Sequence, residues 1–79
     1  MPQWDEKNGI AIYVYGRDHN PPHIHAYYAE HEVLLVIETG VVYAGSLPKA
    51  QLREALEMLD EDREPLTQEW TRLNPSARP

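Results

Sequence analysis

The chain has 79 residues and no cysteine, so it is long enough for one hydrophobic core but can form neither disulfides nor thiolate metal sites. Seven basic residues against thirteen acidic ones give a net charge of −6. This balance disfavours binding to the phosphates of nucleic acids and would suit a basic protein partner better, while the simpler interpretation is that the negative charge only aids solubility.

Four runs rich in β-branched and aromatic residues predict strands in the first half of the chain. They span residues 10–15, 23–28, 32–38 and 41–44. The residues before Gly9, including Trp4, are expected to form an N-terminal arm that docks on the domain. Asn20-Pro21-Pro22 holds the entry to the second run extended, because proline fixes φ and restricts the preceding residue. Connections this short allow only antiparallel pairing, so we expect a meander of three to four strands.

Two amphipathic segments predict helices in the second half, the first with Ser46 as its N-cap. The apolar stripes consist of Leu52, Ala55, Leu56 and Leu59 in the first segment and of Leu66, Trp70 and Leu73 in the second. Helical spacing gives each segment one buried face, so Trp70 is expected in the core. We expect an α+β fold with both helices packed on one face of the sheet. Residues 1–79 then form a single domain, with an ordered core over about 8–73 and a flexible tail at 74–79.

Alternation along the strands divides the sheet into two faces. The face toward the helices is expected to carry Ile10, Ile12, Val14, Ile24, Ala26, Tyr28, Val33, Leu35 and Ile37. The opposite face is expected to carry Tyr13, Tyr15, His23, His25, Tyr27, Leu34 and Val36. Such a face is too apolar to be left in water. We therefore predict an interface at Tyr13, Tyr15, Tyr27, Leu34 and Val36, covered by a second copy of the chain or by a small protein partner.

The histidines of the second run form a candidate metal site. His23 and His25 leave the same face of a strand, separated by roughly 6.5–7 Å along it, and two imidazoles so placed can share one divalent ion such as zinc. His19 is the expected third ligand, with Asp18 as the alternative. The same residues also fit a simpler interpretation, in which the histidines are hydrogen-bonded surface rings and Asp18-His19-Asn20 forms a turn.

Several short segments together resemble a known family. They are Asp18-His19-Asn20-Pro21-Pro22-His23-Ile24-His25, Ile37-Glu38-Thr39-Gly40, Gly45-Ser46-Leu47-Pro48 and Glu69-Trp70. Over about residues 9–73 the chain resembles a bacterial family of domains of unknown function, family four-one-six-zero. The resemblance implies a small stand-alone protein that is often encoded beside another small uncharacterised domain, in gene pairs discussed together with toxin–antitoxin systems. It implies no catalytic residues.

These observations favour a non-enzymatic interaction module, acting as a homodimer or as the partner of a small neighbouring protein, of toxin–antitoxin type. We find no phosphate-binding loop and no nucleophile–base signature in the sequence. A metal-binding protein, or a small metal-dependent enzyme using the histidine cluster, is the alternative. Nucleic-acid binding is a third hypothesis, and the net charge counts against it. No segment has the length of a transmembrane helix and the N-terminus is unlike a signal peptide, so we expect a cytoplasmic protein.

Overall fold

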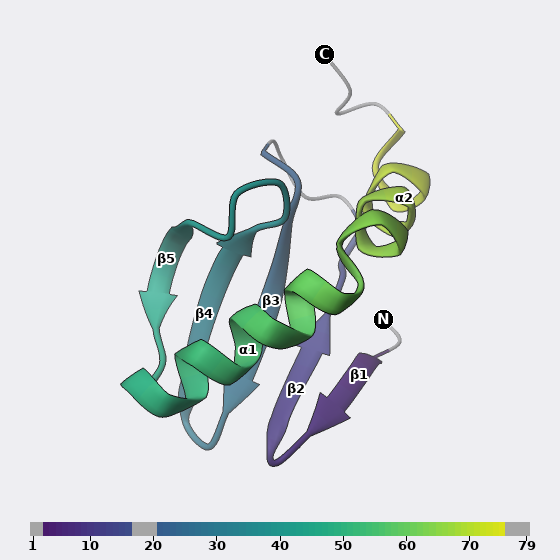
Figure 1. The fold of residues 1–79 in the computed structure, drawn as a ribbon. Helices are drawn as coiled ribbons and strands as arrows, with labels where there is room; N and C mark the ends of the chain where they lie inside the picture. The colour runs from purple at the N-terminus through teal and green to yellow at the C-terminus, as the bar shows by residue number, and fades with distance from the viewer. Residues whose placement is uncertain (1–2, 17–20, 76–79) are drawn as a thin grey trace.

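The computed structural model describes residues 3–16 and 21–75, which form a five-stranded antiparallel sheet followed by two helices (Figure 1). The elements are β1 (Gln3–Lys7), β2 (Ile10–Tyr13), β3 (His23–Tyr28), β4 (His31–Val36), β5 (Val42–Ser46), α1 (Lys49–Glu61) and α2 (Arg63–Leu73). The strands lie in the sheet in chain order, so the sheet is a simple meander. The predicted α+β class and the two C-terminal helices are confirmed. The predicted N-cap of the first helix is wrong, because Ser46 is the last residue of β5 and Pro48 occupies the N-cap position of α1. The predicted number of strands, three to four, is wrong.

The additional strand is β1, in the segment that the sequence pattern assigned to an N-terminal arm. A two-residue turn at Asn8-Gly9 joins β1 to β2 and pairs Lys7 with Ile10. Both turn residues have positive φ, at 53° and 81°, as a tight hairpin turn of the mirror-image type requires. Asn-Gly between two extended runs is the standard sequence signal for such a hairpin, and it is the signal that the arm assignment overlooked.

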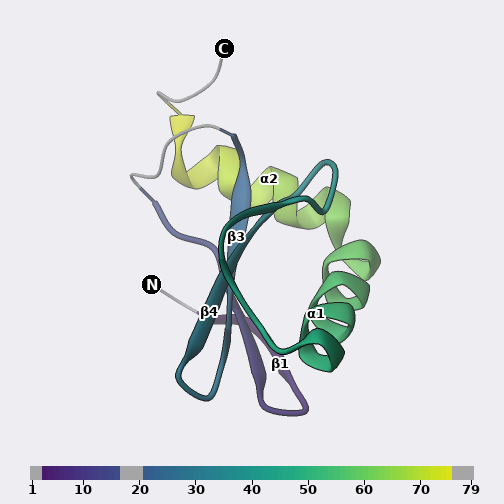
Figure 2. The ribbon, with the colours of Figure 1, turned by 90° about the vertical axis from the view of Figure 1, so that its left-hand side faces the viewer.

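Both helices contribute to one core with the inner face of the sheet. The strands and the residues directly after them provide Ile10, Ile12, Val14, Ile24, Ala26, Val33, Leu35 and Ile37, and the helices provide Ala55, Met58, Leu59, Leu66 and Trp70. Tyr28 and Leu73 pack against this cluster while remaining partly exposed. Seen along the sheet, α1 lies to one side of it (Figure 2). The expected burial of Trp70 in the core is confirmed, since only 1 % of its surface is exposed.

The chain stays tied to the domain beyond the last turn of α2. Asn74, which the sequence pattern placed at the start of the tail, is buried. Its side-chain Nδ2 donates to the carbonyl oxygens of Tyr15 at 3.0 Å and Trp70 at 2.9 Å. Residues 76–79 of the expected tail lie outside the described residues. Neither helix is long and apolar enough to span a membrane, in the part of the chain that the structure describes.

Candidate functional site

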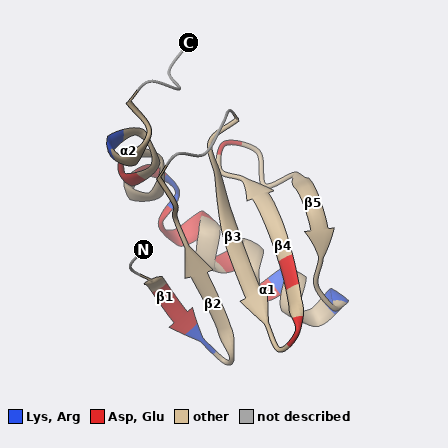
Figure 3. Ribbon diagram, turned by 180° about the vertical axis from the view of Figure 1, so that it is seen from behind, with Lys and Arg blue, Asp and Glu red and all other residues tan. Residues whose placement is uncertain are grey.

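The candidate site is the face of the sheet turned away from the core, which we call the outer face. It carries Tyr13, Tyr15, His23, His25, Tyr27, Leu34 and Val36. Seen from behind, β3, β4 and β5 have neither described helix in front of them (Figure 3). All five residues of the predicted interface are half-buried rather than fully exposed.

Strand register brings these side chains into rows across the sheet. Tyr13 pairs with His25, and His25 pairs with Leu34. One pleat further on, His23 pairs with Val36. Directly opposite residues in an antiparallel sheet have their Cβ atoms about 4.5–5.5 Å apart, so each row is a continuous strip of contacts.

Four rings at the centre of the outer face hold one another in place. Tyr13 stacks on Tyr15 with ring centroids 5.7 Å apart, and it meets Tyr27 edge-on at 5.4 Å. Tyr15 meets His25 edge-on at 4.5 Å. The hydroxyl groups of Tyr15 and Tyr27 are hydrogen-bonded to each other at 3.0 Å. Offset and edge-on contacts of this kind stabilise aromatic pairs, so the four rings form a pre-ordered surface.

A carboxylate borders these rings. Nδ1 of His25 donates to Oε2 of Glu32 at 2.9 Å. Burial, above all, raises the pKa of Tyr27, and the hydrogen bond with Tyr15 and the nearby Glu32 carboxylate raise this pKa further. Tyr27 therefore keeps its hydroxyl proton to a higher pH than an ordinary tyrosine does.

The Pro-Pro segment positions His23, which is entirely buried. Its Nδ1 donates to the carbonyl oxygen of Pro21 at 2.7 Å. Its ring lies 5.2 Å from that of His25 and 5.4 Å from that of Tyr43, measured between centroids. The register of β3 thus places the two histidines side by side on the outer face.

The predicted third metal ligands cannot be placed beside them. Asp18 and His19 lie outside the described residues. Within residues 3–16 and 21–75, no group of three His, Cys, Asp or Glu side chains could hold a metal ion. His23 and His25 are therefore the only part of the proposed ligand set that the structure places.

Charge is distributed unevenly around the outer face (Figure 3). Strands β2, β3 and β5 contain no Asp, Glu, Lys or Arg, β4 contains Glu32, and Glu6 on β1 pairs with Ala11 of the outer face. The described basic residues are Lys7 on β1 and Lys49, Arg53, Arg63 and Arg72 on the helices. The described strands that form the outer face thus have an uncharged aromatic centre and carboxylates along one row.

Tyr43 is an outer-face residue that the sequence pattern did not identify. The register of β4 and β5 shifts between Leu34 and Leu35, where Leu34 pairs with Ala44 and Leu35 with Val42. Tyr43 is the extra residue of this bulge, and its ring contacts His23. Simple alternation cannot anticipate a bulge, because the inserted residue breaks the period of two.

Two cavities lie away from the aromatic rings. One, of about 360 Å³, lies between the turn at Thr39 and Gly40 and the charged side of α1. The other, of about 250 Å³, lies between Pro21-Pro22 and Arg63. The Arg63 guanidinium donates to the carbonyl oxygens of Ile37 and Glu38 and to the Asp60 carboxylate. Because the Arg63 guanidinium already joins the start of α2 to the turn after β4, neither cavity is assigned a ligand site.

Comparison with known proteins gives one match. Residues 9–71, from the turn before β2 to near the end of α2, match the family model described as domain of unknown function DUF4160. No curated protein matches the chain. No solved structure matches it either.

Proposed function

The chain belongs to the DUF4160 family of domains of unknown function, and we propose that it is a non-enzymatic protein-interaction module. The outer face carries the interaction. The observation behind this proposal is a half-buried aromatic surface that neither described helix covers, on a domain whose other face is fully occupied by its core. Tyrosine is enriched at protein interfaces because it combines a large apolar ring with a polar hydroxyl.

Pre-ordering of the rings supports this function. Association costs free energy for every side chain that must be immobilised. On the outer face, Tyr13, Tyr15 and Tyr27 are already held by ring contacts and by the hydroxyl pair between Tyr15 and Tyr27. Little rotamer freedom remains to be lost when a partner binds, so these tyrosines are suited to be the anchors of the interface.

The charge of the outer face favours a basic partner over a second copy bound face to face. In a face-to-face dimer, the Glu6 and Glu32 carboxylates of one copy would face the equally acidic surface of the other copy. A partner with arginine side chains would instead pair with Glu32 and stack on the tyrosine rings. The small protein encoded beside this one, as in a toxin–antitoxin pair, is the partner we propose.

Light scattering coupled to size-exclusion chromatography tests this proposal with the purified neighbouring protein. The wild-type chain should form a complex with it. Leu34→Lys places a cation in the outer face and should weaken the complex about tenfold or more. Gln68→Lys, which adds the same charge on the exposed side of α2, should bind like the wild type. Equal binding by both variants, or no complex with the wild type, would rule the proposal out.

Metal binding at the histidines is the second candidate function, and one observation favours it. Both His23 and His25 use Nδ1 to donate to an oxygen, of Pro21 and Glu32 respectively. Metal-binding histidines are oriented in this way, with the other ring nitrogen as the ligand. Zinc should then raise the melting temperature of the wild type and leave that of a His23→Ala, His25→Ala variant unchanged. An unchanged wild-type melting temperature, together with no zinc in the purified protein, would exclude this function.

A further inference from the structure

We propose that two copies of this protein associate edge to edge through β5, each copy adding an antiparallel strand to the sheet of the other. This contact is separate from the outer face that binds the proposed partner. It joins two five-stranded sheets into one, about a twofold axis that runs perpendicular to the sheet.

Exposure of apolar side chains is concentrated at this edge. Val41, Val42 and Tyr43 have 59 %, 44 % and 41 % of their surface exposed, and they are the large hydrophobic residues that stand out as exposed in the described chain. Every residue of β5 is exposed as well. β5 is the last strand of the sheet, so among the described residues no strand pairs with the backbone on its other side. An apolar edge of this kind is a template for pairing with another strand.

The two edges of the sheet differ in charge, and this difference identifies the occupant. β1, at the opposite edge, carries Asp5, Glu6 and Lys7 (Figure 3). Charged side chains on an edge strand oppose pairing with another chain. By contrast, residues 39–48 contain no Asp, Glu, Lys or Arg. Each copy has a net charge of −6, so two copies approach with least repulsion along a stretch without charge.

Identical strands paired antiparallel about a twofold axis are self-complementary, which is what a contact between two copies requires. The regular part of the edge is short, because the bulge at Tyr43 and the positive φ of Gly45, 74°, interrupt it. Few backbone hydrogen bonds can therefore form. Burial of Val41, Val42 and Tyr43 from both copies must contribute much of the stability, and these are the side chains that the isolated chain leaves exposed.

The edge also continues into the outer face. The Tyr43 ring lies 5.4 Å from that of His23, and the His23 ring lies 5.2 Å from that of His25. With the twofold axis perpendicular to the sheet, both outer faces point the same way. The dimer would therefore carry the tyrosines of both outer faces on one side of the joined sheet.

Light scattering over a range of concentrations tests this dimer. The wild-type chain should have the mass of a dimer at high concentration. Val42→Lys places a charge on the edge and should weaken the dimer about tenfold or more. Asp5→Lys, a charge change at the opposite edge, and Leu34→Lys, on the outer face, should leave the mass unchanged. A monomeric wild type, or a dimer that Leu34→Lys disrupts and Val42→Lys does not, would overturn the proposal.

Hydrogen exchange on the wild-type chain gives a readout that does not depend on the folding of a variant. Amides of residues 42–46 should exchange more slowly at high protein concentration than at low concentration, and those of β1 should exchange alike at both. Concentration-independent exchange of residues 42–46 would overturn the proposal. The partner titration separates the two proposals, since Val42→Lys should still bind the partner through its outer face.

Discussion

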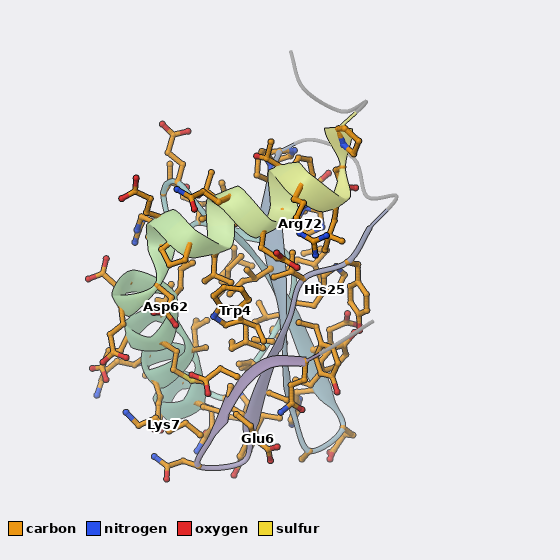
Figure 4. All side chains as sticks on the ribbon, turned by 90° about the vertical axis from the view of Figure 1, so that its right-hand side faces the viewer. Trp4, Glu6, Lys7, His25, Asp62 and Arg72 are labelled. Atoms are coloured by element: carbon orange, nitrogen blue, oxygen red, sulfur yellow. The ribbon has the colours of Figure 1, made fainter. Side chains whose placement is uncertain are left out.

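Nε1 of Trp4 donates a hydrogen bond to Oδ2 of Asp62 at 3.2 Å, joining the edge strand β1 to the junction between the two helices (Figure 4). The Trp4 ring also packs against the hydrophobic core. These two residues are 58 positions apart, so the contact links the first strand to the helical half of the chain. The first strand is thus held both by its pairing with β2 and by the contact of Trp4 with the helix junction.

Removing this bond should lower stability without changing the fold. Trp4→Phe keeps most of the apolar ring and removes the donor, and should cost about 1 kcal/mol, which is a fall in melting temperature of about 4–8 °C. Thermal denaturation followed by circular dichroism measures this change.

The matching double-mutant cycle isolates the bond itself. Asp62→Ala and the variant with both changes complete the cycle. The coupling free energy between the two sites should be about 1 kcal/mol. Purely additive effects would show that the two side chains do not interact in solution.

The inner face of the sheet and both helices were predictable from the sequence, because burial there follows simple periods. Ile10, Ile12 and Val14 alternate along a strand, and Leu66 and Trp70 recur at the helical spacing. A hydrophobic period could not predict β1, since Gln3–Lys7 is mostly polar and mostly exposed. Its only strong signal was the Asn8-Gly9 turn. This strand could therefore be predicted from the chemistry of its turn and not from a hydrophobic pattern.

The candidate site was predictable to the extent that it depends on alternation. Tyr13 and Leu34 share a face because both lie opposite His25 in register, and Tyr27 joins them because it lies two residues from His25 on β3. The placement of Tyr43 depends on a bulge, and the burial of Asn74 depends on two carbonyl oxygens that it caps. Both are tertiary features that leave no period in the sequence.

Gly45 should tolerate no side chain. Its φ is +74°, which L-residues adopt at a cost of roughly 1–2 kcal/mol, and an added Cβ would overlap the carbonyl oxygen of Glu32 on β4. Gly45→Ala should therefore lower the free energy of unfolding by more than about 2 kcal/mol. Urea denaturation measures this. Gly16→Ala is the control, because its Cβ would lie at an ordinary contact distance of 3.4 Å from the Leu73 carbonyl oxygen, and should change stability little.

Asn74 should stabilise the end of α2 despite its position near the C-terminus. Its Nδ2 supplies hydrogen bonds to the carbonyl oxygens of Tyr15 and Trp70. Asn74→Ala removes both from a buried position, which should cost about 1–3 kcal/mol in urea denaturation. Gln68→Ala, in an exposed position of α2, should cost less than about 0.5 kcal/mol. Equal effects of the two changes would mean that residue 74 already belongs to the tail.

Tyr27 should make the domain sensitive to alkaline pH. Burial, the hydrogen bond with Tyr15 and the Glu32 carboxylate all raise its folded-state pKa above the ordinary value of about 10. Above that pH the unfolded chain releases the Tyr27 proton while the folded chain retains it, so folding stability is intact below about pH 10 and falls as pH rises further. Urea denaturation at a series of pH values from about 8 to about 11, in steps on the order of half a pH unit, measures this fall.

Two substitutions in the same hydrogen-bonded group test whether Tyr27 causes the loss of stability at high pH. Tyr27→Phe removes the titrating hydroxyl and should flatten the loss of stability above about pH 10. Glu32→Gln removes the negative charge that helps to raise the Tyr27 pKa, and should reduce the total loss of stability at high pH. If all three proteins lose stability with the same slope, Tyr27 keeps an ordinary pKa in the folded state, and the hydroxyl pair on the outer face does not form in solution. An ordered outer face requires the opposite result, because the same contacts that raise this pKa hold the rings ready for a partner.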